Sequence, residues 1–234
     1  MIKMSATKVK TVQSCKRQYY YKYIERLETK PNARAVLGRC IHKAIELGFQ
    51  GEDPFQVYAQ QWAEQSQEVE DRRGFAKIYD EGLKMLVLYD FSQTAPIEME
   101  IGFELPFPNR EHPICMMEGI IDQIFSDHVI VDLKTSLRKP LQGVLDNSAQ
   151  FVLYAWAYET LFGVQPKIYW HHLRTGDRIE AHVHDEEKFQ NLYDTVLHTV
   201  QLRTQTESIR DYHQNIGFEC QFCSFRATCL GTEN

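Results

Sequence analysis

Four cysteines, one near the start of the chain and three near its end, constrain the fold more than any other feature of the sequence. Cys15 stands alone, whereas Cys220, Cys223 and Cys229 crowd together as C-x2-C-x5-C. A hydrophobic core does not require three thiols so close together at one end of a chain. A metal centre does, because its thiolate ligands must converge on one point. If Cys15 is a fourth ligand, the fold must bring the two ends of the chain together.

Length and composition are typical of a globular protein with its own core. The 234 residues are 43% hydrophobic, which is enough for a core that needs no disulfide bonds. Six cysteines without a secretory leader indicate a reducing compartment and thiolate chemistry. No apolar run approaches the roughly 20 residues that a membrane span needs. We therefore expect a soluble, cytoplasmic protein with no membrane partner.

Charge is segregated along the chain. The formal net charge is −6, yet residues 1–43 carry eleven Lys and Arg residues against two acidic residues. The remainder carries fifteen basic and thirty acidic residues. Such segregation predicts a basic surface beside an acidic region, which can bind a divalent cation. A solvated basic helix face remains the simpler alternative for the first segment.

Helical patterns dominate the first part of the chain and return later. Ser5 or Thr7 can cap the first helix, with Cys15 near its middle, and Gly163 ends a later one. The run of tyrosines that follows Cys15 is expected mainly to pack, although some rings can stack on bases. Helices are expected over residues 5–27, 34–48, 54–70, 72–92, 146–162 and 185–206.

Strand patterns begin after Pro96. These segments are rich in β-branched and aromatic residues, and Asp127-His128 and Thr175-Gly176-Asp177 provide turns. The order of helices and strands predicts a mixed α/β core with additional helices. Strands are expected over residues 97–107, 114–125, 128–134, 166–173 and 178–184.

Two aspartates and a lysine on neighbouring strands predict a cation site. Side chains alternate along a strand, so Asp132 and Lys134 share one face while Leu133 points to the core. Asp122 ends the preceding strand, and two carboxylates brought close together repel unless a cation or a proton lies between them. A hard divalent cation suits this pair, and Lys134 can polarise water or offset the charge of a phosphate.

Two helices carry further candidate residues. Gln150 and Tyr154 are four residues apart and share one helix face, as do Gly38, His42 and Glu46. The Gln–Tyr pair is uninformative by itself. A lone histidine is usually structural, but beside the two aspartates His42 becomes a candidate ligand.

These motifs, in this order, resemble the RecB-like branch of the PD-(D/E)XK nuclease superfamily over nearly the whole chain. The closest likeness is to the iron–sulfur exonucleases of CRISPR adaptation and of AddB-type helicase–nuclease subunits. Ile121 stands where the superfamily's name places a proline, a departure that is common in this branch. The resemblance rests on Ser14-Cys15 with the following tyrosines, Gly38-x3-His42-x3-Glu46, Gly119-x2-Asp122, Asp132-x-Lys134, Gln150-x3-Tyr154 and the closing cysteine triplet.

The resemblance implies a role for each matching residue. His42, Asp122, Asp132 and the backbone carbonyl of Leu133 would bind Mg²⁺ or Mn²⁺, and Lys134 would orient or activate the attacking water. Gln150 and Tyr154 would position this lysine and the DNA backbone. A [4Fe–4S] cluster would be bound by Cys15, Cys220, Cys223 and Cys229.

The fold that the resemblance implies is a restriction-endonuclease-like α/β core within one nuclease domain. Residues 1–95 would form a mainly helical N-terminal region that carries Cys15. Residues 96–206 would form the nuclease core, and residues 207–234 the C-terminal iron–sulfur segment.

The expected function is metal-dependent hydrolysis of DNA, as an exonuclease on single strands, with endonuclease activity left open. DNA repair, recombination and CRISPR adaptation all fit, with a helicase or a CRISPR-adaptation protein as partner. Two alternatives remain: a catalytically silent DNA-binding or assembly subunit, and an interaction module held by zinc. Four thiolates bind zinc as well as an iron–sulfur cluster, although the irregular spacing favours the cluster.

Overall fold

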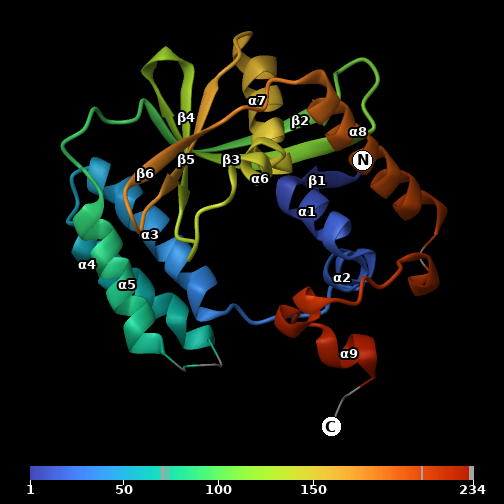
Figure 1. Cartoon of the computed structure of the whole chain (residues 1–234), viewed down its shortest axis with the longest axis horizontal. Helices are drawn as coiled ribbons and strands as arrows, with labels where there is room; N and C mark the ends of the chain where they lie inside the picture. Colours follow the sequence, from blue (N-terminus) through green and yellow to red (C-terminus); the bar gives the residue numbers. More distant parts are fainter. Residues whose placement is uncertain (70–71, 73, 207, 232–234) are drawn as a thin grey trace.

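The computed structural model describes residues 1–69, 72, 74–206 and 208–231, and a six-stranded mixed sheet lies at the centre of this part (Figure 1). The strand order is β1-β3-β4-β5-β6, and β2 pairs with β3 outside this path. The arrangement confirms the expected mixed α/β class. The strands are β1 (Lys3–Ser5), β2 (Glu98–Phe107), β3 (Cys115–Phe125), β4 (Val129–Lys134), β5 (Lys167–His172) and β6 (Asp177–Ala181).

Helices cover both faces of the sheet, and shorter helical turns join them. Ser5 caps the first helix, and Gly163, with a φ of 72°, follows the C-terminus of α7 as expected. The helices are α1 (Ala6–Ser14), α2 (Lys16–Tyr19), α3 (Ala33–Phe49), α4 (Pro54–Gln65), α5 (Phe75–Leu88), α6 (Gln142–Asp146), α7 (Ala149–Phe162), α8 (Glu186–Gln205) and α9 (Arg226–Leu230).

The sheet separates two hydrophobic cores. One core lies between the sheet and α1, α7 and α8, and the other lies between the sheet and α3, α4 and α5. Strand β4 shows the alternation directly, because Ile130 belongs to the first core while Val131 and Leu133 belong to the second. Asp132 and Lys134 therefore share one face of the strand, and this face is the one on the side of α7.

Strand β3 pairs with three other strands, and one of its edges is unpaired over a short stretch. On one edge it pairs with β2, and on the other it pairs first with β1 and then with β4. Ladder pairing on that second edge stops over residues 119–122, which leaves Asp122 between the two partners. The gap at this edge is where the candidate site forms.

Glycine at position 119 has a packing reason. The Phe103 ring crosses over it from the paired strand, and a Cβ at Gly119 would lie 2.5 Å from the ring. Phe103 also meets Tyr154 edge to face, with ring centroids 6.4 Å apart. Gly119 therefore lets β2 and α7 pack closely beside Asp122.

The prediction of one helix over residues 5–27 is wrong. The chain begins with β1, which pairs with β3, and α1 ends at Ser14. Cys15 then adopts an extended backbone, with φ of −161° and ψ of 114°, before α2 and a π-helical turn over Tyr20–Ile24. Cys15 is thus partly exposed at a break between helices and does not lie within one.

The two ends of the described chain are in contact, as the cysteine pattern predicts. Arg17 Nε donates to the carbonyl of Tyr212 at 2.8 Å, and Asn215 Nδ2 donates to the carbonyl of Ser14 at 2.8 Å. The tyrosine run joins them further, since the ring of Tyr20 lies 5.1 Å from that of Tyr212. Most of these rings pack, as expected.

Several expected boundaries shift by a few residues. The expected helix over 146–162 begins at Ala149, after the separate short helix α6. The helix expected over 54–70 ends at Gln65 and continues as a 3₁₀ turn over Ser66–Glu68. The last residue of that expected helix, residue 70, lies outside the described residues. The same holds for residues 71, 73, 207 and 232–234 of other expected segments. Among the described helices, none is long and apolar enough to span a membrane.

Candidate functional site

Strand β4 carries a buried ion pair. Asp132 is fully buried, and its Oδ1 accepts a hydrogen bond from Lys134 Nζ at 2.9 Å. Its Oδ2 lies 2.8 Å from the same ammonium group. The period of two along a strand places both side chains on one face, so a single segment of β4 supplies a carboxylate and a cation.

Asp122 reaches across the opening in the sheet to β4. Its Oδ2 accepts a hydrogen bond from the backbone N–H of Leu133 at 2.7 Å. On the other side of this peptide segment, His42 Nε2 lies 3.0 Å from the carbonyl oxygen of Leu133. His42 comes from α3, so the site joins the helical layer to the sheet.

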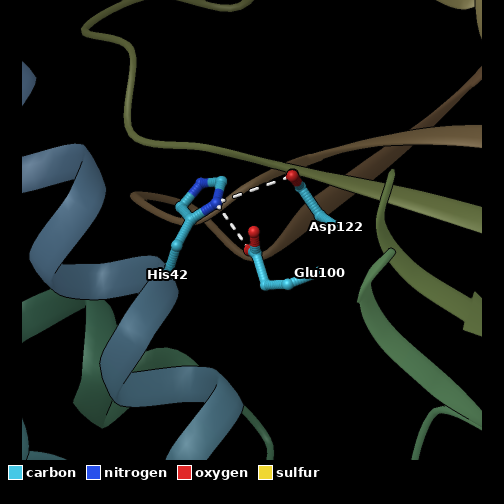
Figure 2. Close-up of side chains that lie close together, drawn as sticks. All are labelled: His42, Glu100 and Asp122. Carbon is cyan, nitrogen blue, oxygen red and sulfur yellow. Dashed lines mark ion pairs between the residues drawn. The ribbon is translucent and has the colours of Figure 1, made fainter. Parts of the chain in front are cut away.

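Glu100 completes the group, and sequence reasoning did not include it. Its Oε1 lies 3.5 Å from His42 Nδ1, and Asp122 Oδ1 lies 3.6 Å from the same nitrogen (Figure 2). One ligand atom from each of the three residues lies within 4.8 Å of the others. Met99 pairs with Gln123 and Ile101 pairs with Ile121, so Glu100 on β2 lies opposite Asp122 on β3. The backbone of Glu100 has a φ of 49°. We call His42, Glu100, Asp122, Asp132 and Lys134 the carboxylate cluster.

Helix α7 braces Asp132 of the carboxylate cluster on the sheet face opposite α3. Gln150 Nε2 donates to Asp132 Oδ1 at 3.1 Å and to the hydroxyl of Tyr154 at 2.7 Å. The Tyr154 hydroxyl in turn donates to the carbonyl of Ile120 on β3. The predicted Gln–Tyr pair therefore shares a hydrogen-bond network with the buried aspartate, which fixes the orientation of that carboxylate.

Burial and charge shift the pKa values within the cluster. Burial raises the pKa of Asp122 to about 6, and nearby Asp132 adds to the rise against the opposing charges of His42 and Lys134. Burial alone would lower the pKa of His42, but Asp122 and Glu100 outweigh it and raise that pKa to about 8. Burial also opposes the charge of Lys134, yet the two aspartates raise its pKa. Without a cation, protons and the lysine balance the carboxylates.

The residues present fit a hard divalent cation. Asp132 Oδ2 is buried, and the Lys134 ammonium, 2.8 Å away, is the polar group that faces it among the described residues, so this carboxylate can also turn a lone pair to a cation. Carboxylate oxygens, one imidazole and a backbone carbonyl are donors suited to Mg²⁺ or Mn²⁺. His42, Glu100 and Asp122 each offer one ligand atom within 4.8 Å of the others, with Nδ1 the imidazole nitrogen that faces the two carboxylates. His42 Nε2 lies 3.0 Å from the Leu133 carbonyl.

The four cysteines of the sequence pattern line one pocket. All four thiols are free and partly exposed, and the segments that carry them are short. Gln214 Nε2 donates to the Sγ of Cys229 at 3.1 Å, and the backbone N–H of Gly217 lies 3.5 Å from the Sγ of Cys220. We call this arrangement of Cys15, Cys220, Cys223 and Cys229 the cysteine pocket.

Other titratable residues, including Glu46 of the sequence pattern, lie outside the carboxylate cluster. Glu46 forms an ion pair with Lys43 at 2.9 Å, while Glu104 and Glu118 pair with lysines of the N-terminal segment. Cys40 and Cys115 are buried in the two cores, as expected for structural thiols.

Comparison with known proteins agrees with this architecture. Residues 3–230 match the sequence model that describes the PD-(D/E)XK nuclease superfamily. No curated protein matches the chain.

Solved structures give a second comparison. A candidate exonuclease from Eubacterium rectale is 13% identical, with a TM-score of 0.58 over 94% of this chain and 86% of its own. At that identity the likeness shows a shared fold. The protein SSO0001 is 14% identical over 100% of this chain and 89% of its own, with a TM-score of 0.46.

Proposed function

This chain belongs to the PD-(D/E)XK nuclease superfamily, and we propose that it is a metal-dependent exonuclease that hydrolyses single-stranded DNA. The observation that carries the proposal is the carboxylate cluster, in which two buried aspartates meet Lys134 and His42 at the opening in the sheet. A merely structural ion pair of Asp132 and Lys134 would not need a second buried carboxylate beside it, since like charges repel unless a cation or a proton lies between them.

The proposed cation ligands are His42, Asp122, Asp132 and the Leu133 carbonyl, with Glu100 as a further candidate. A bound Mg²⁺ or Mn²⁺ would supply Lewis-acid stabilisation of the charge that develops on the scissile phosphate. The protein's part is to hold the ligands in place before the cation arrives, through the β3–β4 hydrogen bond to Asp122 and the α7 bracing of Asp132.

Lys134 is proposed to stabilise the phosphate. Its raised pKa keeps it protonated at neutral pH, so it acts as a donor to phosphate oxygens or to the attacking water and not as a base. Lys134 and Gln150 line a surface pocket together with Thr7 and Lys10 of α1. A phosphate that enters this pocket meets two ammonium groups beside Asp132.

Exonuclease action on single strands is supported by less direct observations. The similar fold of a candidate exonuclease agrees with it, and the basic N-terminal segment suits phosphate binding without sequence readout. DNA repair, recombination or CRISPR adaptation, with a helicase or adaptation protein as partner, is the setting that we propose.

We also propose that the cysteine pocket binds a [4Fe–4S] cluster that holds the two ends of one nuclease domain together. The shared pocket and the hydrogen bonds between residues 14–17 and 212–215 support this role. In this arrangement residues 1–95, 96–206 and 207–234 act as parts of a single domain. Structural zinc is the alternative, and a brown, anaerobically purified protein with visible absorption would distinguish the cluster from colourless zinc.

The proposed function is tested by digestion of single- and double-stranded DNA labelled at either end, with Mg²⁺, Mn²⁺ or EDTA. We expect metal-dependent release of short products that is faster on single strands, and none in EDTA. DNA binding without cleavage under every divalent cation would favour a catalytically silent subunit instead.

A further inference from the structure

A pocket lined by basic side chains lies beside the N-terminal strand. Its lining includes residues of β1, α1, the π-helical turn after α2, the segment that follows this turn, and α8: Lys3, Lys8, Lys22, Tyr23, Arg26 and Arg203. Residues far apart in the sequence therefore gather five cationic groups around one tyrosine. We call this the basic pocket.

The basic pocket has positive charge that the protein does not neutralise. Lys3 and Lys8 are balanced by Glu104 at 2.6 Å and Glu118 at 2.8 Å. Lys22 and Arg26, by contrast, are exposed and form no ion pair within the described part of the chain. Two unpaired cations on one wall attract an anion and release its counterions when it binds.

The ring of Tyr23 in the basic pocket is held in place by neighbouring side chains. The Tyr23 ring is partly exposed and packs against the ring of Tyr19, with centroids 5.1 Å apart. Lys22 Nζ and Lys8 Nζ lie 5.3 and 5.8 Å from its centroid. An aromatic ring among cations is the combination that binds single-stranded nucleic acid, because every base has a face to stack.

A second pocket lies between the residues of the basic pocket and those that brace the carboxylate cluster. Lys8 bonds to Glu118, and Glu118 lines a neighbouring pocket together with Gln150 and Tyr154, which brace the buried aspartate. The junction of β1 and α1, at Ser5, forms part of the same wall. The ion pair of Lys8 and Glu118 therefore joins the walls of the two pockets, beside the start of α1.

We propose that the basic pocket is a second binding subsite for single-stranded DNA, away from the bond that is cut. Lys22 and Arg26 contact phosphates and Tyr23 stacks on a base, while another part of the same strand lies at Asp132 and Lys134. The inference rests on the proposed function for the identity of its ligand.

The test measures binding of a fluorescent single-stranded oligonucleotide to the full chain in EDTA, by anisotropy over a range of salt concentrations. Replacing Lys22 and Arg26 by Gln together removes two phosphate contacts. The slope of log affinity against log salt should then fall by about 1.4, and affinity at 0.1 M salt by about 25-fold. A matched control replaces Lys77 and Lys84, both exposed on α5, by Gln and should keep the parent slope.

A second pair of variants tests the stacking role. Tyr23→Ala should weaken single-strand binding by roughly 5- to 100-fold, while Tyr23→Phe keeps the ring and should stay near the parent. Duplex DNA of the same length should not respond to Tyr23→Ala, because its bases are not available to stack. Circular dichroism on each variant verifies that it is folded.

The proposal is overturned if the Lys22/Arg26 double variant keeps the parent affinity and salt slope. It is also overturned if polyglutamate displaces the oligonucleotide as well, charge for charge, since the pocket then binds anions in general. Either result leaves metal-dependent cleavage by the parent protein intact, whereas failure of the proposed function would appear as the absence of cleavage with binding unchanged.

Discussion

The carboxylate cluster and the cysteine pocket both gather metal-binding side chains, but the chain builds them differently. In the carboxylate cluster, strands β3 and β4 fix the side chains, and hydrogen bonds from Leu133, Lys134 and Gln150 orient the aspartates. In the cysteine pocket, four partly exposed thiols project from a helix break and from short turns near the C-terminus.

This difference separates a centre that exists before its ligand binds from one that depends on its ligand. The hydrogen bonds of the sheet hold the side chains of the carboxylate cluster in place without a cation. A cation that binds therefore only has to displace protons from these side chains. The cysteine pocket has little regular structure to hold it, so a bound metal would supply much of its stability. Activity should therefore depend on the first centre, and the integrity of the chain ends on the second.

The largest expected effect follows from Asp132→Asn. The amide keeps the shape of the side chain but removes the charge that binds a cation, so cleavage of end-labelled single-stranded DNA in Mn²⁺ should fall roughly a thousandfold. Asp177→Asn on β6, which removes an exposed carboxylate paired with Lys139, is the matched control and should cleave like the parent. Cleavage by Asp132→Asn within tenfold of the parent would contradict the assignment.

Cys223→Ser should act on stability and leave the chemistry nearly unchanged. Loss of one thiolate should release the bound metal and lower the unfolding midpoint by roughly 10 °C, with new protease sensitivity near both ends of the chain. Calorimetry, metal analysis and limited proteolysis measure these effects. Cys40→Ala, which removes a buried core thiol, should keep the metal; an unchanged metal content in Cys223→Ser would remove the distinction between the two regions.

Glu100→Gln should have a smaller effect that appears in metal dependence. If Glu100 supports the cation through His42 or directly, the metal concentration for half-maximal cleavage should rise roughly 10- to 100-fold, with little change at saturation. Glu104→Gln on the same strand is the matched control, because that carboxylate pairs with Lys3. Equal metal dependence in the two variants would exclude Glu100 from the cluster's function.

The smallest expected effect is the pH dependence of metal-free stability. His42 has its pKa raised from 6.5 to about 8, so its stabilising contribution is complete below pH 6.5 and is lost as pH rises through 8. The pKa of Asp122 is raised from 3.8 to about 6, so its stabilising contribution is already lost between pH 3.8 and pH 6. In EDTA the unfolding midpoint should fall by roughly 3–8 °C from pH 6 to pH 9.

Saturating Mg²⁺ should flatten that dependence, because a cation takes the place of the proton on His42. His42→Asn should flatten it as well in EDTA. A metal-free midpoint that is equal or higher at pH 9 in the parent protein would show that the histidine is not held protonated by Asp122 and Glu100.

The sequence predicts the centre of the fold because local patterns specify it. Alternation along β4 places Asp132 and Lys134 on one face, and helical spacing pairs Gln150 with Tyr154, as the structure shows. The order of strands and helices also follows from local periodicity and turn residues. Roles in catalysis remain proposals that the variants above address.

Features that depend on distant pairing could not be predicted in this way. The strand β1 is three residues long and exists because β3 pairs with it. In the sequence, nothing distinguishes Glu100 from the nearby Glu98 and Glu104. Only the pairing of β2 with β3, which places Glu100 opposite Asp122, identifies it as a member of the carboxylate cluster. The break at Cys15 is hidden because helical residues flank it on both sides, while contacts with the C-terminal segment determine its conformation.

The most direct test of the central claim is a titration with Mn²⁺ followed by electron paramagnetic resonance, on the parent protein, Asp122→Asn and Cys223→Ser. The account predicts tight Mn²⁺ binding that Asp122→Asn abolishes and Cys223→Ser retains in its folded fraction. Tight Mn²⁺ binding that survives in Asp122→Asn, or that disappears with the cysteine, would contradict the claim that the carboxylate cluster holds the catalytic cation.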